Sequence, residues 1–208
     1  MTDRPTPAAA WEDLAAGNGR FLAGEALHPR QDADRRAELA RTQVPKATFF
    51  GCSDSRLAAE IIFDQGIGDL FVVRNAGQVV SPSAVASLEY AVAVLGVPLV
   101  VVLAHDRCGA VQAAVDEAGP DGSPLPPLIA AHIAPIRPAV AAVRAAHPDT
   151  PVDPAAVGRL HLEATVAGLL TASELLSAAV ADGSLAIVGA EYRLAEGRVE
   201  RHVAVGVV

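Results

Sequence analysis

Four short stretches of the chain are almost uninterruptedly apolar, and a fifth alternates between polar and apolar positions. The apolar runs are "ATFFGC" (47–52), "DLFVVRNAG" (69–77), "PLVVVLAH" (98–105) and "SLAIVGAEY" (184–192). Such runs are typical of central strands in a parallel sheet that is covered on both faces. The final segment, "RVERHVAVGVV", follows a Glu196–Gly197 turn and predicts an edge strand in a hairpin.

Helical spacing fills the intervals between these runs. Apolar positions recur every three or four residues over 56–65, 82–95, 109–118 and 155–181. Two loops rich in proline and glycine, 119–127 and 148–154, flank a further helix of about 20 residues. Strands that alternate with helices indicate an α/β fold with right-handed crossovers. We therefore expect a central, mostly parallel sheet of about four strands plus a C-terminal edge strand, flanked by helices.

The amino-terminal segment predicts a helical arm over residues 1–45. Thr6 followed by Pro7 is a favourable helix start, with a capping hydroxyl and proline at the first helical position. The spacing carries this helix through Trp11 and Leu14 to a stop at Gly17–Asn18, and a second helical stretch follows around Phe21. The length of 208 residues suits one domain, residues 1–208, with a substantial core.

Composition and charge exclude several classes of partner. The net charge of -8 without a Lys/Arg cluster argues against nucleic acid and against anionic membranes. The first residues lack the pattern of a secretory signal, and we find no apolar window of the ~18 residues that a membrane span needs. We therefore expect a cytoplasmic protein. In that reducing compartment a disulfide between the two cysteines, Cys52 and Cys108, is disfavoured.

Reactive side chains cluster where two of the predicted strands end. Cys52, Asp54 and Arg56 follow the first strand, while His105 and Cys108 follow the third. Functional groups collect at the carboxyl ends of parallel strands, so Cys52, His105 and Cys108 converge if these strands are neighbours. Two thiolates and one imidazole are a zinc set that leaves a fourth position open, as catalytic sites do. Asp54 could reach the metal itself, or Arg56 could hold it beside the metal.

Simpler interpretations of the same residues remain open at this point. The cysteines could be ordinary buried thiols, His105 a strand-end histidine, and Asp54–Arg56 a surface ion pair. A zinc-binding scaffold without turnover would have no need of Asp54 and Arg56. A cysteine phosphatase would need its cysteine and arginine six positions apart, whereas Cys52 and Arg56 are four apart. The remaining histidines are expected to be surface or core residues without function: His28, His132, His147, His161 and His202.

Several motifs in order resemble the β-class carbonic anhydrases over roughly residues 10 to 206. They are "CSDSR", "FVVRNAG", "SLEYAV" and "HDRCGA", preceded by an opening "AWEDLAAGNGRF" that is similar to the amino-terminal helical arm of that family. The resemblance implies reversible hydration of carbon dioxide to bicarbonate and a proton, by attack of zinc-bound hydroxide. It also implies a homodimer that can pair into a tetramer. A related zinc hydrolase acting on CS2 or COS shares the ligand set and is the alternative.

Carried over by position, the resemblance assigns roles to individual residues. Cys52, His105 and Cys108 match the zinc ligands, and Asp54 with Arg56 matches the catalytic aspartate–arginine dyad. Asp54 is also a possible fourth zinc ligand in a closed state at low pH. The residues that match substrate-binding positions are Gln43, which reaches across the dimer interface, Phe71 and Tyr90 in the apolar pocket, and Gly109 beside the last ligand.

Two features depart from the family pattern. Asp106 and Arg107 follow the histidine ligand where many members carry serine or threonine first. Some members also hold inhibitory bicarbonate between a tryptophan, an arginine and a tyrosine. Arg74 and Tyr192 match two of these, but Phe49 stands at the tryptophan position and lacks an N–H donor. The resemblance therefore does not predict an inhibitory bicarbonate pocket in this chain.

Overall fold

A single five-stranded sheet organises the chain. The computed structural model describes residues 4–119, 122 and 124–208, so residues 120, 121 and 123 of the predicted loop 119–127 lie outside it. The strands lie in the order β2-β1-β3-β4-β5, with β1 to β4 parallel and β5 antiparallel to β4. Their bounds are β1 (Ala47–Cys52), β2 (Leu70–Asn75), β3 (Leu99–His105), β4 (Ala186–Arg193) and β5 (Arg198–Val205). The predicted fold class is confirmed.

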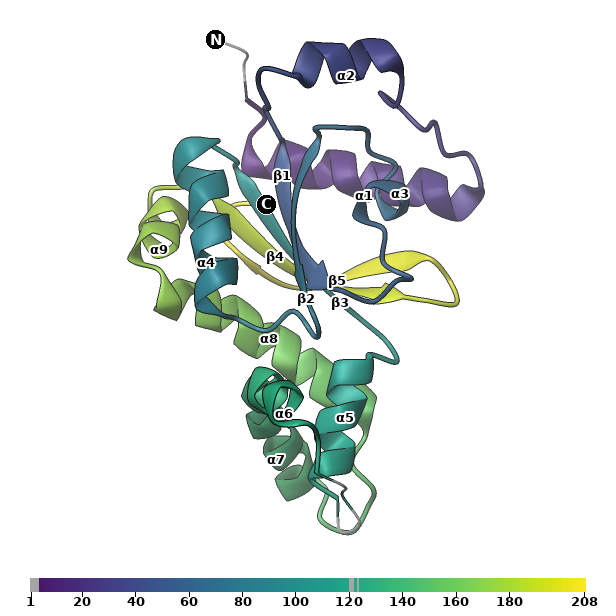
Figure 1. Ribbon diagram of the computed structural model, residues 1–208, viewed down its shortest axis with the longest axis vertical. Coiled ribbons are helices and arrows are strands. Elements are labelled where there is room, and N and C mark those ends of the chain that lie inside the picture. Colours follow the sequence, from purple (N-terminus) through teal and green to yellow (C-terminus); the bar gives the residue numbers. More distant parts are fainter. Residues whose placement is uncertain (1–3, 120–121, 123) are drawn as a thin grey trace.

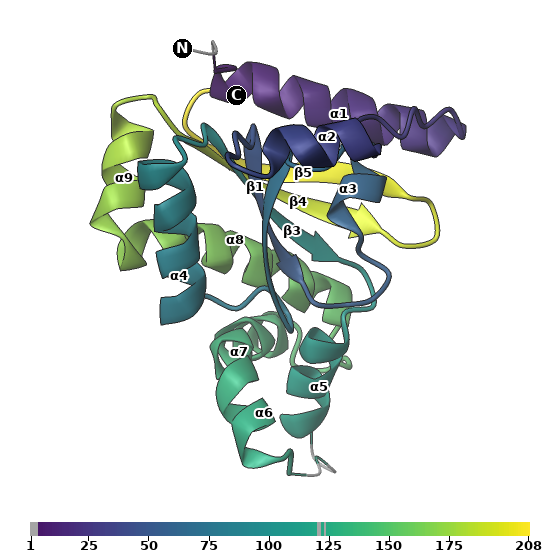
Figure 2. The same cartoon turned by 45° about the horizontal axis from the view of Figure 1, so that its top comes forward.

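Helices cover both faces of this sheet and extend beyond one end of it. Helices α1 and α3 pack on one face, α4, α8 and α9 lie on the other, and α5, α6 and α7 gather beyond the carboxyl ends of the parallel strands (Figures 1 and 2). The bounds are α1 (Pro7–Ala23), α2 (Ala33–Leu39), α3 (Ala59–Ile62), α4 (Pro82–Glu89), α5 (Gly109–Glu117), α6 (Pro127–Ile133), α7 (Arg137–Ala146), α8 (Pro154–Ala172) and α9 (Glu174–Ala181). A π-helical turn (Tyr90–Val94) continues α4, and a 3₁₀ turn (Ala134–Ile136) joins α6 to α7.

Each inner strand supplies side chains to two separate hydrophobic cores. On β1, Phe49 enters the core beneath α1 and α3, and Phe50 enters the core beneath α4 and α8. Both rings are fully buried. Successive side chains of a strand point to opposite faces, so a strand covered on both sides must be apolar throughout. This is the physical reason for the uninterrupted apolar runs in the sequence.

The order of the strands determines where the reactive residues meet. The chain passes from β1 outward to β2 and then returns to place β3 on the other side of β1. This reversal is the switch point at which ligands bind in open α/β sheets, outside the carboxyl ends of the strands. β1 ends at Cys52 and β3 ends at His105, and the two strands are paired in register. The expected convergence of these two strand ends is therefore confirmed.

The predicted stop of the first helix at Gly17–Asn18 is wrong, since α1 runs on to Ala23 and ends at Gly24, which adopts φ +70°. Gly17 and Asn18 instead lie where α1 packs closely against the end of α3 and the β4–β5 turn. The Asn18 side chain donates hydrogen bonds to the carbonyls of Ile62 (3.1 Å) and Gly197 (2.9 Å) and accepts one from the N–H of Val199. A helix-breaking dipeptide in sequence is here the contact through which the arm binds α3 and the β4–β5 turn.

A substitution at Gly17 tests this close packing of α1. A Cβ at Gly17 would lie 1.8 Å from the carbonyl oxygen of Phe63, whereas a Cβ at Gly19 in the same helix meets nothing within 4 Å. We expect Gly17→Ala to lower the free energy of unfolding by about 3 kcal/mol through this overlap. Gly19→Ala should raise it by about 0.5 kcal/mol, because alanine favours the helix. Urea unfolding of both variants checks the prediction, and two equally stable variants would contradict it.

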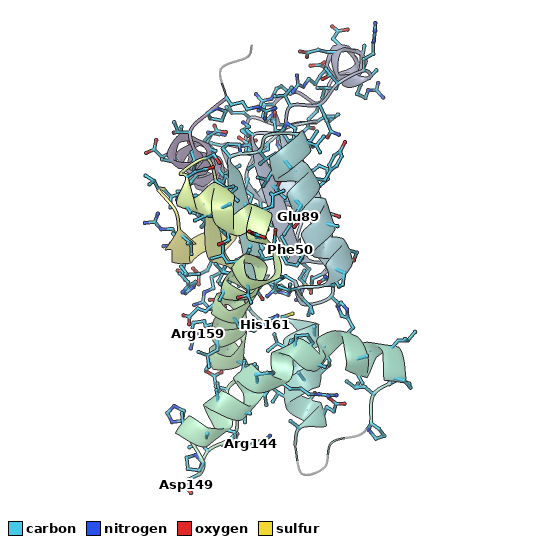
Figure 3. All side chains as sticks on the ribbon, turned by 90° about the vertical axis from the view of Figure 1, so that its left-hand side faces the viewer. Phe50, Glu89, Arg144, Asp149, Arg159 and His161 are labelled. Atoms are coloured by element: carbon cyan, nitrogen blue, oxygen red, sulfur yellow. The ribbon has the colours of Figure 1, made fainter. Side chains whose placement is uncertain are left out.

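Two other predicted helices have different limits in the structure. The single helix expected over 155–181 is two helices bent by 99° at Ser173. Ser173 adopts an extended conformation, and its hydroxyl accepts the N–H of Leu176 while donating to Glu89 on α4, which Figure 3 labels. The segment 56–65 forms only the short helix α3.

The expectation that no apolar stretch reaches the length of a membrane span is also wrong, as judged by the length and composition of one helical stretch. The helical stretch Pro127–Ala146 is long and apolar enough for a membrane span by length and composition, and 28% of it is buried inside the structure. Its polar contacts tie it to α5. Arg137 forms a bidentate ion pair with Glu117, and Arg144 donates to the carbonyl of Ala118. The structure therefore uses this stretch as part of the α5–α7 group.

Candidate metal centre

Three side chains from two adjacent strand ends converge on one point. The ligand atoms of Cys52, His105 and Cys108 all lie within 4.8 Å of one another, and all three residues are buried. The two sulfur atoms are 4.0 Å apart. Two sulfurs bound at ~2.3 Å to a tetrahedral zinc ion stand roughly 3.8 Å apart, so the separation suits such an ion. Cys108 reaches the point because the chain turns sharply through Arg107, which adopts φ +52°.

The imidazole of His105 is oriented for a ligand. Its Nδ1 donates a hydrogen bond to the backbone carbonyl of Asp106 at 2.8 Å, which fixes the tautomer and leaves the Nε2 lone pair free. Nε2 is fully buried, and among the described residues it has no hydrogen-bond partner. A buried acceptor without a partner costs free energy of folding. A cation bound by Nε2 and the two sulfurs would remove this cost. The donor set therefore fits a zinc ion.

The electrostatics of the cysteine pair favour cation binding. The hydrogen bond from the Cys108 thiol, together with the one from the Gly77 N–H, lowers the pKa of Cys52 to about 4 despite burial. Sharing that hydrogen bond, together with burial, raises the pKa of Cys108. The Gly77 N–H donates to the Cys52 sulfur at 3.2 Å. A sulfur that loses its proton readily, beside a second sulfur and an imidazole, favours the binding of a divalent cation, because thiolates are the form of cysteine that binds metal.

Asp54 and Arg56 form a closed pair beside this point. The guanidinium of Arg56 binds both carboxylate oxygens of Asp54, at 2.8 and 2.7 Å, and the Arg56 N–H adds a third bond at 2.9 Å. These hydrogen bonds hold the pKa of Asp54 well below its usual range, so the carboxylate stays ionised. One of its oxygens lies 3.8 Å from His105 Nε2. Asp54 is therefore beside the three-ligand group and not part of it.

Arg74 supports the loop that carries the dyad, a role that the sequence analysis did not assign to it. Its guanidinium donates to the backbone carbonyls of Cys52 (2.9 Å) and Asp54 (2.6 Å). The register of β1 and β2 places Arg74 opposite Gly51, one residue before the ligand. The position of Arg74 near the end of the second apolar run is the signal that could have indicated this contact. Arg74 matches the arginine of the inhibitory bicarbonate pocket, but here its guanidinium is engaged by these two carbonyls.

Asp106 and Arg107, which depart from the family pattern, make hydrogen bonds that involve the backbone. The carboxylate of Asp106 accepts the N–H of Leu194 at 2.7 Å, and the Asp106 N–H donates to the carbonyl of Tyr192. The carbonyl of Arg107 faces the guanidinium of Arg56 at 3.4 Å. Asp106 thereby joins the end of β3 to the end of β4. Its contacts strengthen the scaffold beneath His105.

The structure does not bring Gln43, Phe71 and Tyr90 to the metal centre of their own chain. Gln43 is exposed and precedes β1, and the register places Phe71 opposite Thr48, at the amino end of that strand. Four residues of strand separate that level from Cys52, about 13 Å. Tyr90 packs near Phe71, with ring centroids 6.2 Å apart, and is 46% exposed. Phe71 and Tyr90 therefore lie toward the opposite end of the sheet from the metal centre of their own chain.

Gly109 and its neighbours form one side of the centre. Gly109 is the first residue of α5, directly after Cys108, and a Cβ there would meet nothing within 4 Å. The packing of this chain therefore does not itself require glycine at that position. An apolar hollow of about 400 Å³ opens beside it, lined by Ala76, Gly109, Ala110, Leu128, Ile129 and His132. The first turn of α5 thus borders an apolar hollow that the three ligand residues do not themselves line.

A second group of possible ligands lies on the edge hairpin. Glu191, Glu200 and His202 bring their polar atoms within 4.8 Å of one another. Arg193 lies between the two carboxylates, 3.5 Å from Glu191 and 3.3 Å from Glu200. Because this guanidinium already supplies positive charge to both, the group is an ion-pair network of the β4–β5 hairpin.

Comparisons with known proteins agree with this geometry. The protein family described as carbonic anhydrase matches residues 47–199. Carbonic anhydrase 2 of Mycobacterium tuberculosis is 48% identical over 192 residues, covering 92% of this chain and 91% of that protein. Carbonic anhydrase of Mycolicibacterium smegmatis is 47% identical over 194 residues, covering 93% and 92%. These relatives span both the arm and the sheet.

Solved structures show the same fold. The β-carbonic anhydrase CafA of Aspergillus fumigatus superposes with a TM-score of 0.73 at 26% identity, covering 92% of this chain and 90% of that chain. One of two tetrameric β-carbonic anhydrases from Sordaria macrospora gives a TM-score of 0.73 at 24% identity, covering 94% and 98%.

Proposed function

This chain belongs to the β-carbonic anhydrase family, and from that premise we propose that it hydrates carbon dioxide reversibly at a zinc ion held by Cys52, His105 and Cys108. One observation carries the proposal. The buried Nε2 of His105 has no hydrogen-bond partner among the described residues and lies in one group with two sulfurs. Three protein ligands leave a fourth position for water or substrate.

Zinc bound there supplies a Lewis acid that lowers the pKa of a coordinated water toward neutrality, and with it the nucleophile for carbon dioxide. The residues of the chain do the rest. Asp54, ionised and able only to accept hydrogen bonds, orients the attacking water through its proton. Arg56 keeps Asp54 ionised and turned to the correct angle by its bidentate contact. Arg74 holds the loop that carries both.

A second copy of the chain completes the site in this proposal. Gln43, Phe71 and Tyr90 lie at the amino end of the sheet, where Tyr90 and Val94 are well exposed. An isologous dimer would bring these residues to the metal centre of the partner. The structural neighbour from Sordaria macrospora is described as tetrameric, which supports an oligomer here too. We also propose that residues 1–208 act as one domain, supported by the single sheet that they build.

A substrate comparison tests the proposed reaction against its alternative. The zinc-loaded protein should hydrate carbon dioxide rapidly at about pH 8.5, where a zinc-coordinated water is ionised. It should hydrolyse CS2 and COS slowly or not at all. Stopped-flow measurement of proton release follows the first reaction, and sulfide release follows the second. Rapid sulfide release without carbon dioxide turnover would contradict the proposal in favour of a CS2/COS hydrolase.

A further inference from the structure

The loop after β2 delivers a hydrogen bond to one of the proposed metal ligands. This loop, residues 75–79, is closed by the side chain of Asn75, which donates to the carbonyl of Val79 and accepts its N–H, both at 2.8 Å. At its apex Gly77 adopts φ +79° and donates its N–H to the Cys52 sulfur at 3.2 Å. A Cβ on Gly77 would lie 2.8 Å from that of Ala110, so this approach requires glycine.

Two histidines, both expected to be without function, hold the same loop from outside. His132 on α6 places its Nε2 2.8 Å from the carbonyl of Ala76, and His161 on α8 places its Nε2 2.8 Å from the carbonyl of Gly77. A carbonyl oxygen only accepts, so each Nε2 carries the hydrogen. Figure 3 shows His161 on α8, at the junction between the sheet and the α5–α7 group. Helices far apart in sequence therefore converge on two successive peptide groups.

The contact of His132 is coupled to the Cys52 sulfur through one peptide group. The carbonyl of Ala76 and the N–H of Gly77 belong to the same peptide bond, with His132 at one end and Cys52 at the other. A donor on the carbonyl polarises the peptide and strengthens its N–H as a donor, as in any chain of hydrogen bonds. His161 holds the next peptide, and burial lowers the pKa of its ring, so it donates as a neutral imidazole.

We propose that His132 and His161 are positioning residues that aim the Gly77 N–H at the Cys52 sulfur and thereby tune this sulfur as a metal ligand. The inference deepens the proposed function and rests on it for the identity of the metal. A hydrogen bond to a thiolate fixes the orientation of the sulfur toward the metal, which raises the metal affinity, and it withdraws electron density from the sulfur, which moves the charge-transfer band to shorter wavelength. Partners of this kind around a ligand typically change metal affinity or activity by about 10–100-fold when they are removed.

Variants of His132 provide the test, because this ring is only partly buried. His132→Leu removes the donor, and His132→Gln retains an N–H donor on a side chain of similar reach. We expect the zinc dissociation constant of His132→Leu, measured by chelator competition, to be about 10-fold higher than that of the wild type. In the cobalt(II)-substituted protein, its sulfur-to-metal charge-transfer band should move to longer wavelength. His132→Gln should restore both quantities most of the way.

His147→Leu is the matched control, since His147 is exposed at the end of α7, and it should leave both quantities unchanged. His161→Gln should likewise retain the wild-type zinc affinity better than His161→Leu. Wild-type affinity and an unshifted band in folded His132→Leu would overturn the inference. Equal losses in the leucine and glutamine variants of His132 would overturn it too, because they would indicate packing alone. Both readouts are independent of turnover, so a wild type that binds metal without hydrating carbon dioxide would refute the proposed function only.

Discussion

Replacing His105 with alanine is expected to abolish zinc binding and carbon dioxide hydration together. The substitution removes the buried Nε2. The two sulfurs that remain are not enough ligands to hold the ion in a defined geometry. Without the metal, water keeps its ordinary acidity, so we expect the rate to fall by more than about 10⁴-fold. Elemental analysis gives zinc per chain, and stopped-flow proton release gives the rate.

His147→Ala is the control for His105→Ala, because it removes an exposed histidine far along the chain from both strand ends. It should keep about one zinc ion per chain and the full rate. Near-ultraviolet circular dichroism shows whether His105→Ala retains the native packing. A folded His105→Ala protein with stoichiometric zinc and normal turnover would refute the assigned metal centre.

Replacing Asp54 with asparagine is expected to separate zinc binding from catalysis. Asparagine retains the size of the side chain but loses the negative charge that Arg56 binds through two hydrogen bonds. It can also donate, so it no longer serves as an obligatory acceptor for the proton of the attacking water. We expect zinc to stay bound, with kcat/KM for carbon dioxide lower by about 100-fold.

Asp149→Asn serves as the matched control for Asp54→Asn. Asp149 is exposed in the turn after α7, as labelled in Figure 3, and its substitution should change neither zinc content nor rate. An Asp54→Asn protein with the wild-type rate would disprove the role of the carboxylate in orienting water. Loss of zinc from Asp54→Asn would instead make Asp54 a ligand, contrary to the three-ligand group in the structure.

The fold and the convergence of Cys52, His105 and Cys108 could be predicted because both depend on short local patterns. A strand buried on both faces must be apolar, so β1 and β3 are visible in the sequence, and their ends at Cys52 and His105 are visible with them. The order of strands at a switch point then brings these ends together. Little tertiary information is needed for either step.

Contacts between distant segments could not be predicted in this way. Gly17–Asn18 has the composition of a helix stop, but the buried side chain of Asn18 finds three partners in other elements and the helix continues. Ser173 breaks the predicted long helix because Glu89 of another helix accepts its hydroxyl. Local propensity describes one segment at a time, and these outcomes depend on a second segment.

The two positioning histidines illustrate the same limit at the site itself. His132 and His161 stand alone in sequence, without a motif or a spacing that relates them to the cysteines. Their partners are backbone carbonyls, which every residue provides. Only the three-dimensional arrangement of α6 and α8 around the loop 75–79 connects them with Cys52.

The proposed function requires that zinc held by Cys52, His105 and Cys108 carries out carbon dioxide hydration. The most direct measurement is stopped-flow hydration at about pH 8.5 during titration of zinc into chelator-treated protein. We expect the rate to rise linearly with added zinc and to reach a plateau at about one ion per chain, because Cys52, His105 and Cys108 form a single centre whose ligand atoms are not already engaged in ion pairs with an arginine. A protein that binds this zinc ion and still leaves hydration at the uncatalysed rate would contradict the proposed function and indicate a zinc-binding scaffold.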